Sequence, residues 1–213
     1  MRVGIIDYGV GNLGSVARAF EELRTTTVLI DRPADLHGAD CLILPGVGNF
    51  SDCAGILNKN SWIQAIREEV VGFEKPLLGI CLGMQLLGDT SAEGRDGHSE
   101  PTKGLGLIPG KVEHLRTLGC DQRVPHVGWN SITASTPESH LFVGIPPSTD
   151  FYFVHSYVFV ADRPEDVVAV VHHGIDVTAA VQRGRVWGTQ FHPEKSSKAG
   201  FRLLKNFIEG PTC

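Results

Sequence analysis

A cysteine lies between two glycines at the point where an apolar strand passes into a helix. Residues 79–83 read Gly-Ile-Cys-Leu-Gly, the apolar run 76–78 leads into them, and residues 84–87 suit the start of a helix. Glycines two positions either side of a nucleophile permit the sharp strand-to-helix turn of a nucleophile elbow. We therefore expect Cys81 to project its sulfur from the sheet at a helix N-terminus, a location that favours the thiolate over the thiol.

A buried core cysteine is the alternative interpretation, because cysteine is among the most buried residue types. It suits Cys41, which lies inside an apolar run. It does not explain why Cys81 has glycine at both flanking positions, with a strand before it and a helix after it. A nucleophilic cysteine explains these features together.

A histidine and a glutamate that could activate this cysteine lie far downstream. The strand predicted over residues 186–191 runs into His192, Pro193 and Glu194. Pro193 disfavours the helical region for the residue before it, so His192 should be extended. Side chains two apart in an extended segment share a face. Glu194 can then orient the His192 ring, whose other nitrogen accepts the thiol proton.

A glycine-rich segment follows the apolar strand 42–44. Residues 45–48 read Pro-Gly-Val-Gly and could form an ordinary turn. They could equally let a peptide N–H point at the carbonyl that Cys81 attacks, which would stabilise an oxyanion. The residues alone leave both interpretations open.

A second glycine-rich segment matches a different signature. Residues 9–14 read Gly-Val-Gly-Asn-Leu-Gly after a strand, and Asp31 ends the next strand, as in dinucleotide-binding proteins. The second half of the chain offers no further mononucleotide-binding unit, and hydride transfer has no use for a cysteine, a histidine and a glutamate. A tight turn between strand and helix explains the same glycines.

The bulk composition limits the partners. The 213 residues are 42% hydrophobic and 20% charged, with a formal net charge of −5. Lysine and arginine do not cluster, so we expect no nucleic-acid or anionic-membrane partner. We expect neither a transmembrane helix nor a signal peptide, since no apolar stretch is long enough and Asp7 comes too early. Five scattered cysteines without a Cys-x-x-Cys pair favour a cytoplasmic protein without disulfides or a zinc site.

The predicted elements change character halfway along the chain. Strands alternate with helices at first, which implies crossovers in a parallel sheet, and the second half is mostly strands and turns. We expect one α/β domain over residues 1–213, with a central, mostly parallel sheet flanked by helices and a β-rich second half. The predicted helices span residues 12–23, 62–71 and 197–209, the last capped by serine 196 or 197, and residues 88–104 form a loop. The predicted strands span 3–7, 27–31, 41–44, 77–81, 111–115, 124–129, 151–160, 167–172, 177–182 and 186–191.

These motifs resemble those of a known family. Residues 79–85 together with residues 190–196 are similar to the two signature motifs of the class I (triad) glutamine amidotransferases, which have a flavodoxin-like fold. Residues 7–12, 45–48, 127–130 and 152–157 narrow the resemblance to the glutaminase subunits of imidazole glycerol phosphate synthases. The similarity runs from residue 3 to about residue 208.

The resemblance implies roles for particular residues. It implies a catalytic triad of Cys81, His192 and Glu194, and no metal or other cofactor. The backbone of Leu82 and of Val47 or Gly48 would form the oxyanion hole. Glutamine would be bound by a further set of residues, Gln85, Glu93, Val154, His155 and Ser156. Residues at the partner interface and ammonia gate would be Asn12, Trp129, Tyr152 and Lys195.

The resemblance also implies a partner. Such glutaminases form a heterodimer with a (β/α)8-barrel cyclase subunit, which uses their ammonia in histidine biosynthesis. Two departures from the family pattern are Val127, where methionine or isoleucine is usual, and Ser51-Asp52-Cys53 after the oxyanion segment. Neither touches the triad.

Other functions stay open at this point. Close paralogues serve a different synthase in surface-polysaccharide pathways. A redox sensor that uses Cys81 as its thiol, or a dinucleotide-binding protein, could share a related fold. A cysteine peptidase would use Cys81, His192 and a carboxylate but would leave Gln85 and Glu93 unexplained.

Overall fold

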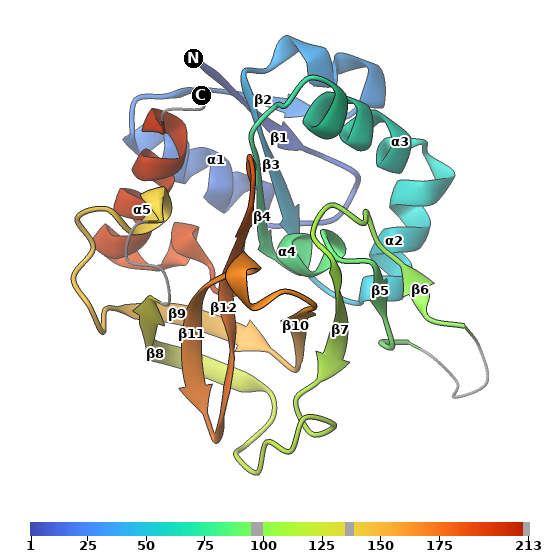
Figure 1. The fold of residues 1–213 in the computed structure, drawn as a ribbon. Coiled ribbons are helices and arrows are strands. Elements are labelled where there is room, and N and C mark those ends of the chain that lie inside the picture. Colours follow the sequence, from blue (N-terminus) through green and yellow to red (C-terminus); the bar gives the residue numbers. More distant parts are fainter. Residues whose placement is uncertain (95–99, 135–138, 211–213) are drawn as a thin grey trace.

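The computed structural model describes residues 1–94, 100–134 and 139–210, which form two β-sheets with helices packed around them (Figure 1). The larger sheet has nine strands among these residues. In spatial order they are β2 (Thr26–Ile30), β1 (Arg2–Ile6), β3 (Cys41–Gly46), β4 (Leu77–Cys81), β13 (Val186–Thr189), β12 (Ile175–Arg183), β11 (Val167–His173), β8 (His126–Ala134) and β9 (Asp150–His155).

The large sheet is parallel from β2 to β13 and antiparallel from β13 to β9. Strands β3 and β4 are buried at every residue, as expected of parallel strands covered on both faces. The order β2-β1-β3-β4 is that of a flavodoxin-like sheet. The predicted fold class is confirmed, with five of the nine strands in the parallel part.

The described residues form five α-helices, which cover both faces of this sheet (Figure 1). One face carries α1 (Leu13–Glu22) and α5 (Ser197–Glu209), and the other carries α2 (Phe50–Lys59), α3 (Trp62–Arg67) and α4 (Leu82–Leu86). Helix α1 buries Val16, Ala19 and Phe20, because apolar residues at i, i+3 and i+4 lie on one side of a helix. The sheet therefore separates two apolar cores.

The smaller sheet corrects the strand predicted over residues 151–160. That segment bends at Ser156 into β9 of the large sheet and β10 (Tyr157–Ala161) of the small one. Its two halves pair with different partners, β9 with β8 and β10 with β7 (Gly110–His114). The small sheet also takes two short strands from the predicted loop, β5 (Thr90–Ser91) and β6 (Thr102–Lys103). Residues 95–99 of that loop lie outside the described residues.

Helix α2 is an element that the strand and helix predictions missed. Its buried residues follow a helical period, at Phe50, Cys53, Ala54 and Leu57, and the Asn49 side chain caps it by accepting from the Asp52 N–H at 3.2 Å. Both the apolar stripe and the capping residue are local features that the sequence alone could have shown.

Two further predictions need correction. The helix predicted over residues 62–71 ends as α3 at Arg67 and continues as a π-helical turn over Glu68–Gly72. Ser196 does not cap α5 with its side chain; its hydroxyl instead donates to the His192 carbonyl at 2.6 Å and accepts from the Tyr152 N–H at 3.0 Å.

In the described parts of the chain, no helix has the length and apolarity to cross a membrane.

Candidate active site

Cys81 lies on a strained turn that joins β4 directly to α4. Its φ of 55° and ψ of −111° are unusual for any residue but glycine. A side chain at Gly79 would come within 2.6 Å of the Gly83 carbonyl oxygen, and one at Gly83 within 1.8 Å of the Leu44 oxygen on β3. Both glycines are therefore required by the close approach of backbone to backbone, and the structure has the elbow that the spacing predicted.

His192 and Glu194 lie just beyond β13, the strand next to β4. His192 has the extended backbone that Pro193 imposes, with φ −98° and ψ 96°. Glu194 is not part of an extended run as expected, because Pro193–Lys195 form a short 3-10 turn. The pair still forms: His192 Nδ1 donates to Glu194 Oε1 at 2.8 Å, with both side chains almost fully buried. The His192 Nε2 atom is left for the cysteine.

The electrostatics of this group favour a charged imidazole. Burial lowers the pKa of His192, but hydrogen bonds and charge interactions with Cys81 and Glu194 outweigh it and raise the pKa to about 9. The second carboxylate oxygen of Glu194 is buried and has no hydrogen-bond partner among the described residues. His192 is therefore the main compensation for this buried negative charge, and the structure brings the three predicted catalytic side chains together.

A cavity of about 380 Å³ opens beside Cys81 and gathers most of the predicted site. Its walls contain all the residues proposed for the oxyanion hole and for glutamine binding, together with Cys81 and His192. The lining residues are Val47, Gly48, Cys81, Leu82, Gln85, Glu93, Val154, His155, Ser156, Tyr157 and His192. Tyr157 was not predicted, although it ends the 152–157 motif. The wall contains Val154 and His155 of β9 and Tyr157 of β10, because the chain changes sheets at Ser156.

The segment between β3 and α2 forms one wall of this cavity. Gly48 has a φ of 93°, and a side chain built there would meet nothing within 4 Å in the described structure. The Cys53 thiol donates to the Val47 carbonyl at 3.6 Å, so the atypical cysteine noted in the sequence holds the candidate oxyanion peptide. Unlike Gly83, Gly48 is selected by its backbone conformation and not by crowding.

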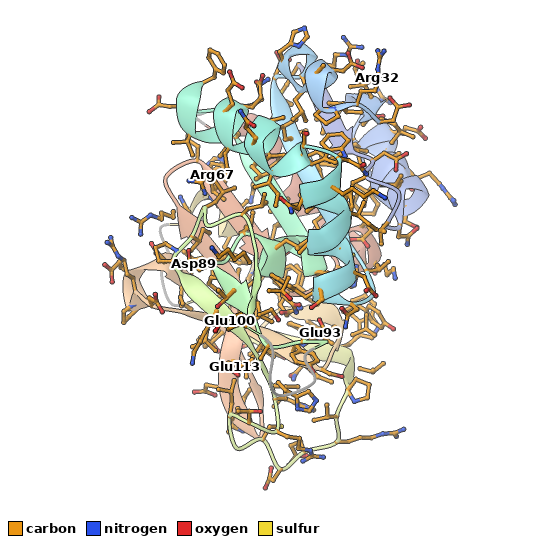
Figure 2. The ribbon with its side chains drawn as sticks, turned by 90° about the vertical axis from the view of Figure 1, so that its right-hand side faces the viewer. Arg32, Arg67, Asp89, Glu93, Glu100 and Glu113 are labelled. Carbon is orange, nitrogen blue, oxygen red and sulfur yellow. The ribbon has the colours of Figure 1, made fainter. Side chains whose placement is uncertain are left out.

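Glu93 closes the cavity from the side of α2. Figure 2 shows it at the N-terminal end of this helix, where its Oε2 accepts from the Phe50 N–H at 2.8 Å. Burial raises the pKa of Glu93, an effect that the Phe50 bond opposes and the charge of Asp52 reinforces. Ser51 donates to the Glu93 carbonyl at 2.6 Å and fixes the same corner. Glu93 therefore presents a carboxyl group whose position is set by the helix.

His155 is held neutral in the opposite wall. Burial, with the neighbouring charge of His126 next in size, lowers the pKa of His155 to about 3. Its Nδ1 donates to the Tyr157 carbonyl at 3.1 Å, and its Nε2 lies 3.0 Å from His126 Nδ1. His126 was not predicted as a functional residue. It has no spacing signal of its own, because it meets His155 only through the pairing of β8 with β9.

The four residues assigned to the partner interface lie outside the cavity lining. Trp129 is 52% exposed and packs edge-on against Tyr152, with ring centroids 6.0 Å apart. The Lys195 ammonium lies 5.9 Å from the Tyr152 ring centroid, so these three side chains form one group. Asn12 lies at the start of α1, where its side chain makes no capping bond to the described helix, and α1 packs beside the turn that carries Lys195.

The described residues contain no group of three or more His, Cys, Asp or Glu side chains placed to hold a metal ion.

The glycines of the dinucleotide-like segment are explained by the turn before α1, where Gly9 and Gly11 have φ of 91° and 136°. Beyond β13 the sheet becomes antiparallel and so lacks the second half of a dinucleotide-binding sheet.

Comparison with known proteins defines the class. Residues 4–210 match the family model described as Glutamine amidotransferase class-I. One solved structure, a crystal structure of a glutamine amidotransferase, superimposes with a TM-score of 0.74 at 22% identity, covering 97% of both chains, and supports the shared fold. The chain belongs to the class-I glutamine amidotransferases.

Two relatives narrow the assignment within this class. Proteins of Moorella thermoacetica and Halalkalibacterium halodurans are each 45% identical to the chain, covering 97% and 96% of it and 94% of either relative. Both are named imidazole glycerol phosphate synthase subunit HisH. Within the class, the chain belongs to the family of these HisH subunits.

Proposed function

We propose that the protein hydrolyses glutamine to glutamate and ammonia, with Cys81 as nucleophile, His192 as base and acid, and Glu194 as the orienting carboxylate. It does so as one amidotransferase domain over residues 1–213, in the cytoplasm, as the glutaminase subunit of an imidazole glycerol phosphate synthase in histidine biosynthesis. The observation that carries the proposal is the meeting of these three side chains at a cavity lined by the glutamine-binding candidates.

The geometry supports the following reaction. His192 Nε2 takes the Cys81 proton, and the thiolate attacks the side-chain amide carbon of glutamine. The imidazolium, stabilised by Glu194, then donates its proton to the leaving nitrogen, and ammonia departs as the thioester forms. Water, deprotonated by His192, attacks the thioester, and the proton returns to the sulfur as glutamate is released.

Groups around the cavity suit the two charges that the reaction presents, the negative oxygen of the tetrahedral intermediate and the ammonium group of the substrate. Leu82, Val47 and Gly48 line the cavity together with Cys81, and the backbone N–H groups of Leu82 and of Val47 or Gly48 would hold the tetrahedral oxyanion. The carboxyl of Glu93 and the amide oxygen of Gln85 are acceptors for the ammonium group of glutamine. The peptide segment 154–156 offers backbone groups to the same substrate.

The proposed acceptor is a separate (β/α)8-barrel cyclase subunit. The exposed Trp129 and its neighbour Tyr152 supply aromatic side chains of the kind enriched at protein interfaces, and Lys195 adds a positive charge beside them. We propose that this surface and Asn12 contact the cyclase and surround the exit of ammonia. The reducing cytoplasm agrees with the thiol state of Cys53, Cys81 and Cys120.

The test is the Cys81→Ala variant combined with the cyclase subunit. We expect glutamine-dependent formation of imidazole glycerol phosphate to vanish, while added ammonium salts still support it, because only the ammonia source is lost. Cys120→Ala, which changes a buried cysteine on the loop before β8, should retain both activities. Loss of the ammonium-dependent activity as well would contradict the assigned role.

The identity of the acceptor subunit needs a separate measurement. Mass spectrometry of the protein that co-purifies with the chain should find a cyclase of the histidine pathway. Recovery of a synthase for surface polysaccharides instead would overturn the pathway while leaving the glutaminase chemistry in place.

A further inference from the structure

Gln190 is a polar residue next to the nucleophile that the reaction above does not use. It follows β13 directly, two residues before His192, and its exposed fraction is 0%. A side-chain amide so deeply buried needs hydrogen-bond partners, because an unmet amide costs free energy in an apolar interior. Its partners are Gln85 and Cys81.

The orientation of the neighbouring Gln85 amide is fixed by a main-chain carbonyl. The Gln85 amide approaches the Tyr157 carbonyl oxygen at 2.9 Å, and His155 Nδ1 donates to the same oxygen at 3.1 Å. A carbonyl oxygen can only accept, so the Gln85 atom that faces it must be Nε2.

The Gln85 amide then fixes the orientation of Gln190. The same Gln85 Nε2 lies 3.0 Å from the Gln190 side chain, and it can only donate. The Gln190 atom that receives this bond must be Oε1. The Nε2 of Gln190 therefore points the other way, toward Cys81 Sγ at 3.8 Å. The chain of bonds from the Tyr157 carbonyl to the sulfur leaves neither amide free to flip.

We propose that Gln190 is a further catalytic residue, which donates an N–H···S hydrogen bond to the Cys81 thiolate. The inference deepens the proposed function, on which it rests for its role in glutamine hydrolysis. Cys81 is only 7% exposed, so little water reaches the sulfur once His192 has taken its proton. A donor aimed at the sulfur stabilises the anion more than the neutral thiol, because hydrogen bonds to charged groups are the stronger ones.

The experiment measures how fast iodoacetamide alkylates Cys81 as a function of pH, with the modified peptide identified by mass spectrometry. Gln190→Leu and Gln190→Met remove the donor and keep similar volume. We expect the midpoint of the pH profile to rise by about one unit, so that the rate at a fixed pH well below the parent midpoint falls about tenfold. The control, Gln182→Leu on neighbouring β12, removes a glutamine whose partner is Ser139 and should keep the parent profile.

The other ionisable groups near Cys81 stay the same in every variant. They are His192 with Glu194 behind it, Tyr8, and the cavity residues Glu93, His155 and Tyr157. A purely structural role for Gln190 would lower the melting temperature without moving the midpoint. An unchanged midpoint in whichever of the Leu and Met variants folds would overturn the proposal.

The alkylation assay needs no glutamine, so it separates this inference from the proposed function. If the parent protein and its cyclase show no glutaminase activity while the midpoint still shifts, the proposed function fails and the hydrogen bond stands. If the glutaminase is active and the midpoint stays in place, the hydrogen bond fails and the function stands.

Discussion

Cys81 shows how the shape of the backbone, before any side-chain chemistry, positions the proposed nucleophile. Its positive φ costs on the order of 1–3 kcal/mol, which the packing around the elbow offsets. That packing is backbone against backbone, from Gly79 to Gly83 and from Gly83 to Leu44 on the neighbouring strand. The elbow is therefore stable only if both glycines lack a side chain.

A substitution at Gly83 tests this crowding. Gly83→Ala would place a methyl group 1.8 Å from the Leu44 oxygen, so we expect the free energy of unfolding to fall by about 3 kcal/mol. Urea denaturation measures the change. The matched control is Gly55→Ala in α2, where nothing among the described atoms lies within 4 Å of the added carbon. It should instead gain about 0.5–1 kcal/mol from helix propensity. Equal effects of the two changes would contradict the crowding argument.

A second residue-scale prediction concerns the buried carboxylate. Glu194→Gln keeps the shape of the side chain but removes a charge that, together with the larger effect of Cys81, raises the pKa of His192. We expect kcat to fall at least tenfold, with glutamine binding retained, because the imidazolium that forms during the reaction loses its partner. Steady-state kinetics and a glutamine titration measure the two effects. An unchanged rate would remove Glu194 from the catalytic group.

The sequence indicated the proposed catalytic residues better than the residues that support them. The glycines around Cys81 and the proline after His192 leave local marks, because they act on the backbone next to them. Gln190, His126 and Tyr157 act through contacts between segments that are distant in the chain, and their spacing in the sequence does not indicate those contacts. Local sequence patterns therefore do not predict contacts between segments that only the folded sheet brings together.

At the scale of elements, the bend at Ser156 matters most for the cavity. A single strand over residues 151–160 was expected from its aromatic and β-branched residues, and composition cannot tell one strand from two in different sheets. The division depends on which neighbours pair with each half, β8 or β7. Helix α2 was not predicted either, although its cap and its apolar stripe are local features that the sequence contains.

The buried histidines His126 on β8 and His155 on β9 should make the stability of the protein depend on pH. Burial lowers the pKa of His126 to about 4 and that of His155 to about 3, against 6.5 for an ordinary histidine. At a pH between the lowered pKa values of the folded state and 6.5, the unfolded chain binds more protons than the folded one. The free energy of unfolding should therefore fall as the pH drops below 6.5. His192, whose pKa is raised to about 9, acts oppositely and loses its contribution as the pH rises from 6.5.

Urea denaturation between pH 4 and pH 7 tests this behaviour. His126→Gln cannot titrate but can still donate to His155, so it should flatten the dependence on pH below 6.5. His37→Gln changes an exposed histidine and should keep the parent slope. A His126→Gln slope equal to that of the parent would show that this buried pair does not control the loss of stability.

At the scale of the whole molecule, the sheet separates two apolar cores and brings the catalytic group to the ends of β4 and β13. These strands are parallel neighbours, so residues that follow them lie side by side although more than a hundred positions separate them. The alternation of strands and helices predicted such a parallel sheet, and the flavodoxin-like order was implied by the family resemblance. The antiparallel extension through β12, β11, β8 and β9 carries Trp129 and Tyr152 of the surface proposed for the partner.

Removal of the exposed indole tests that surface. Trp129→Ala should weaken binding to the cyclase at least tenfold, because exposed tryptophans are enriched among the residues that dominate interface energies. The matched control is Phe73→Ala, which removes another exposed aromatic that follows α3 and its π-helical turn. Figure 1 shows α3 far from β8. Isothermal titration with the cyclase measures both affinities. Equal affinities for the two variants would place the interface elsewhere.

The crowding at the elbow also constrains how this protein can evolve. Gly46 and Gly79 both meet Gly83, and Gly83 meets Leu44, so closely that none of the three glycines has room for a methyl group. Inheritance at these positions is thus dictated by geometry alone, and no change in substrate or partner can relax it. In the cavity wall, by contrast, Val47 and Val154 are each 38% exposed, so a lineage can exchange their side chains without disturbing the elbow.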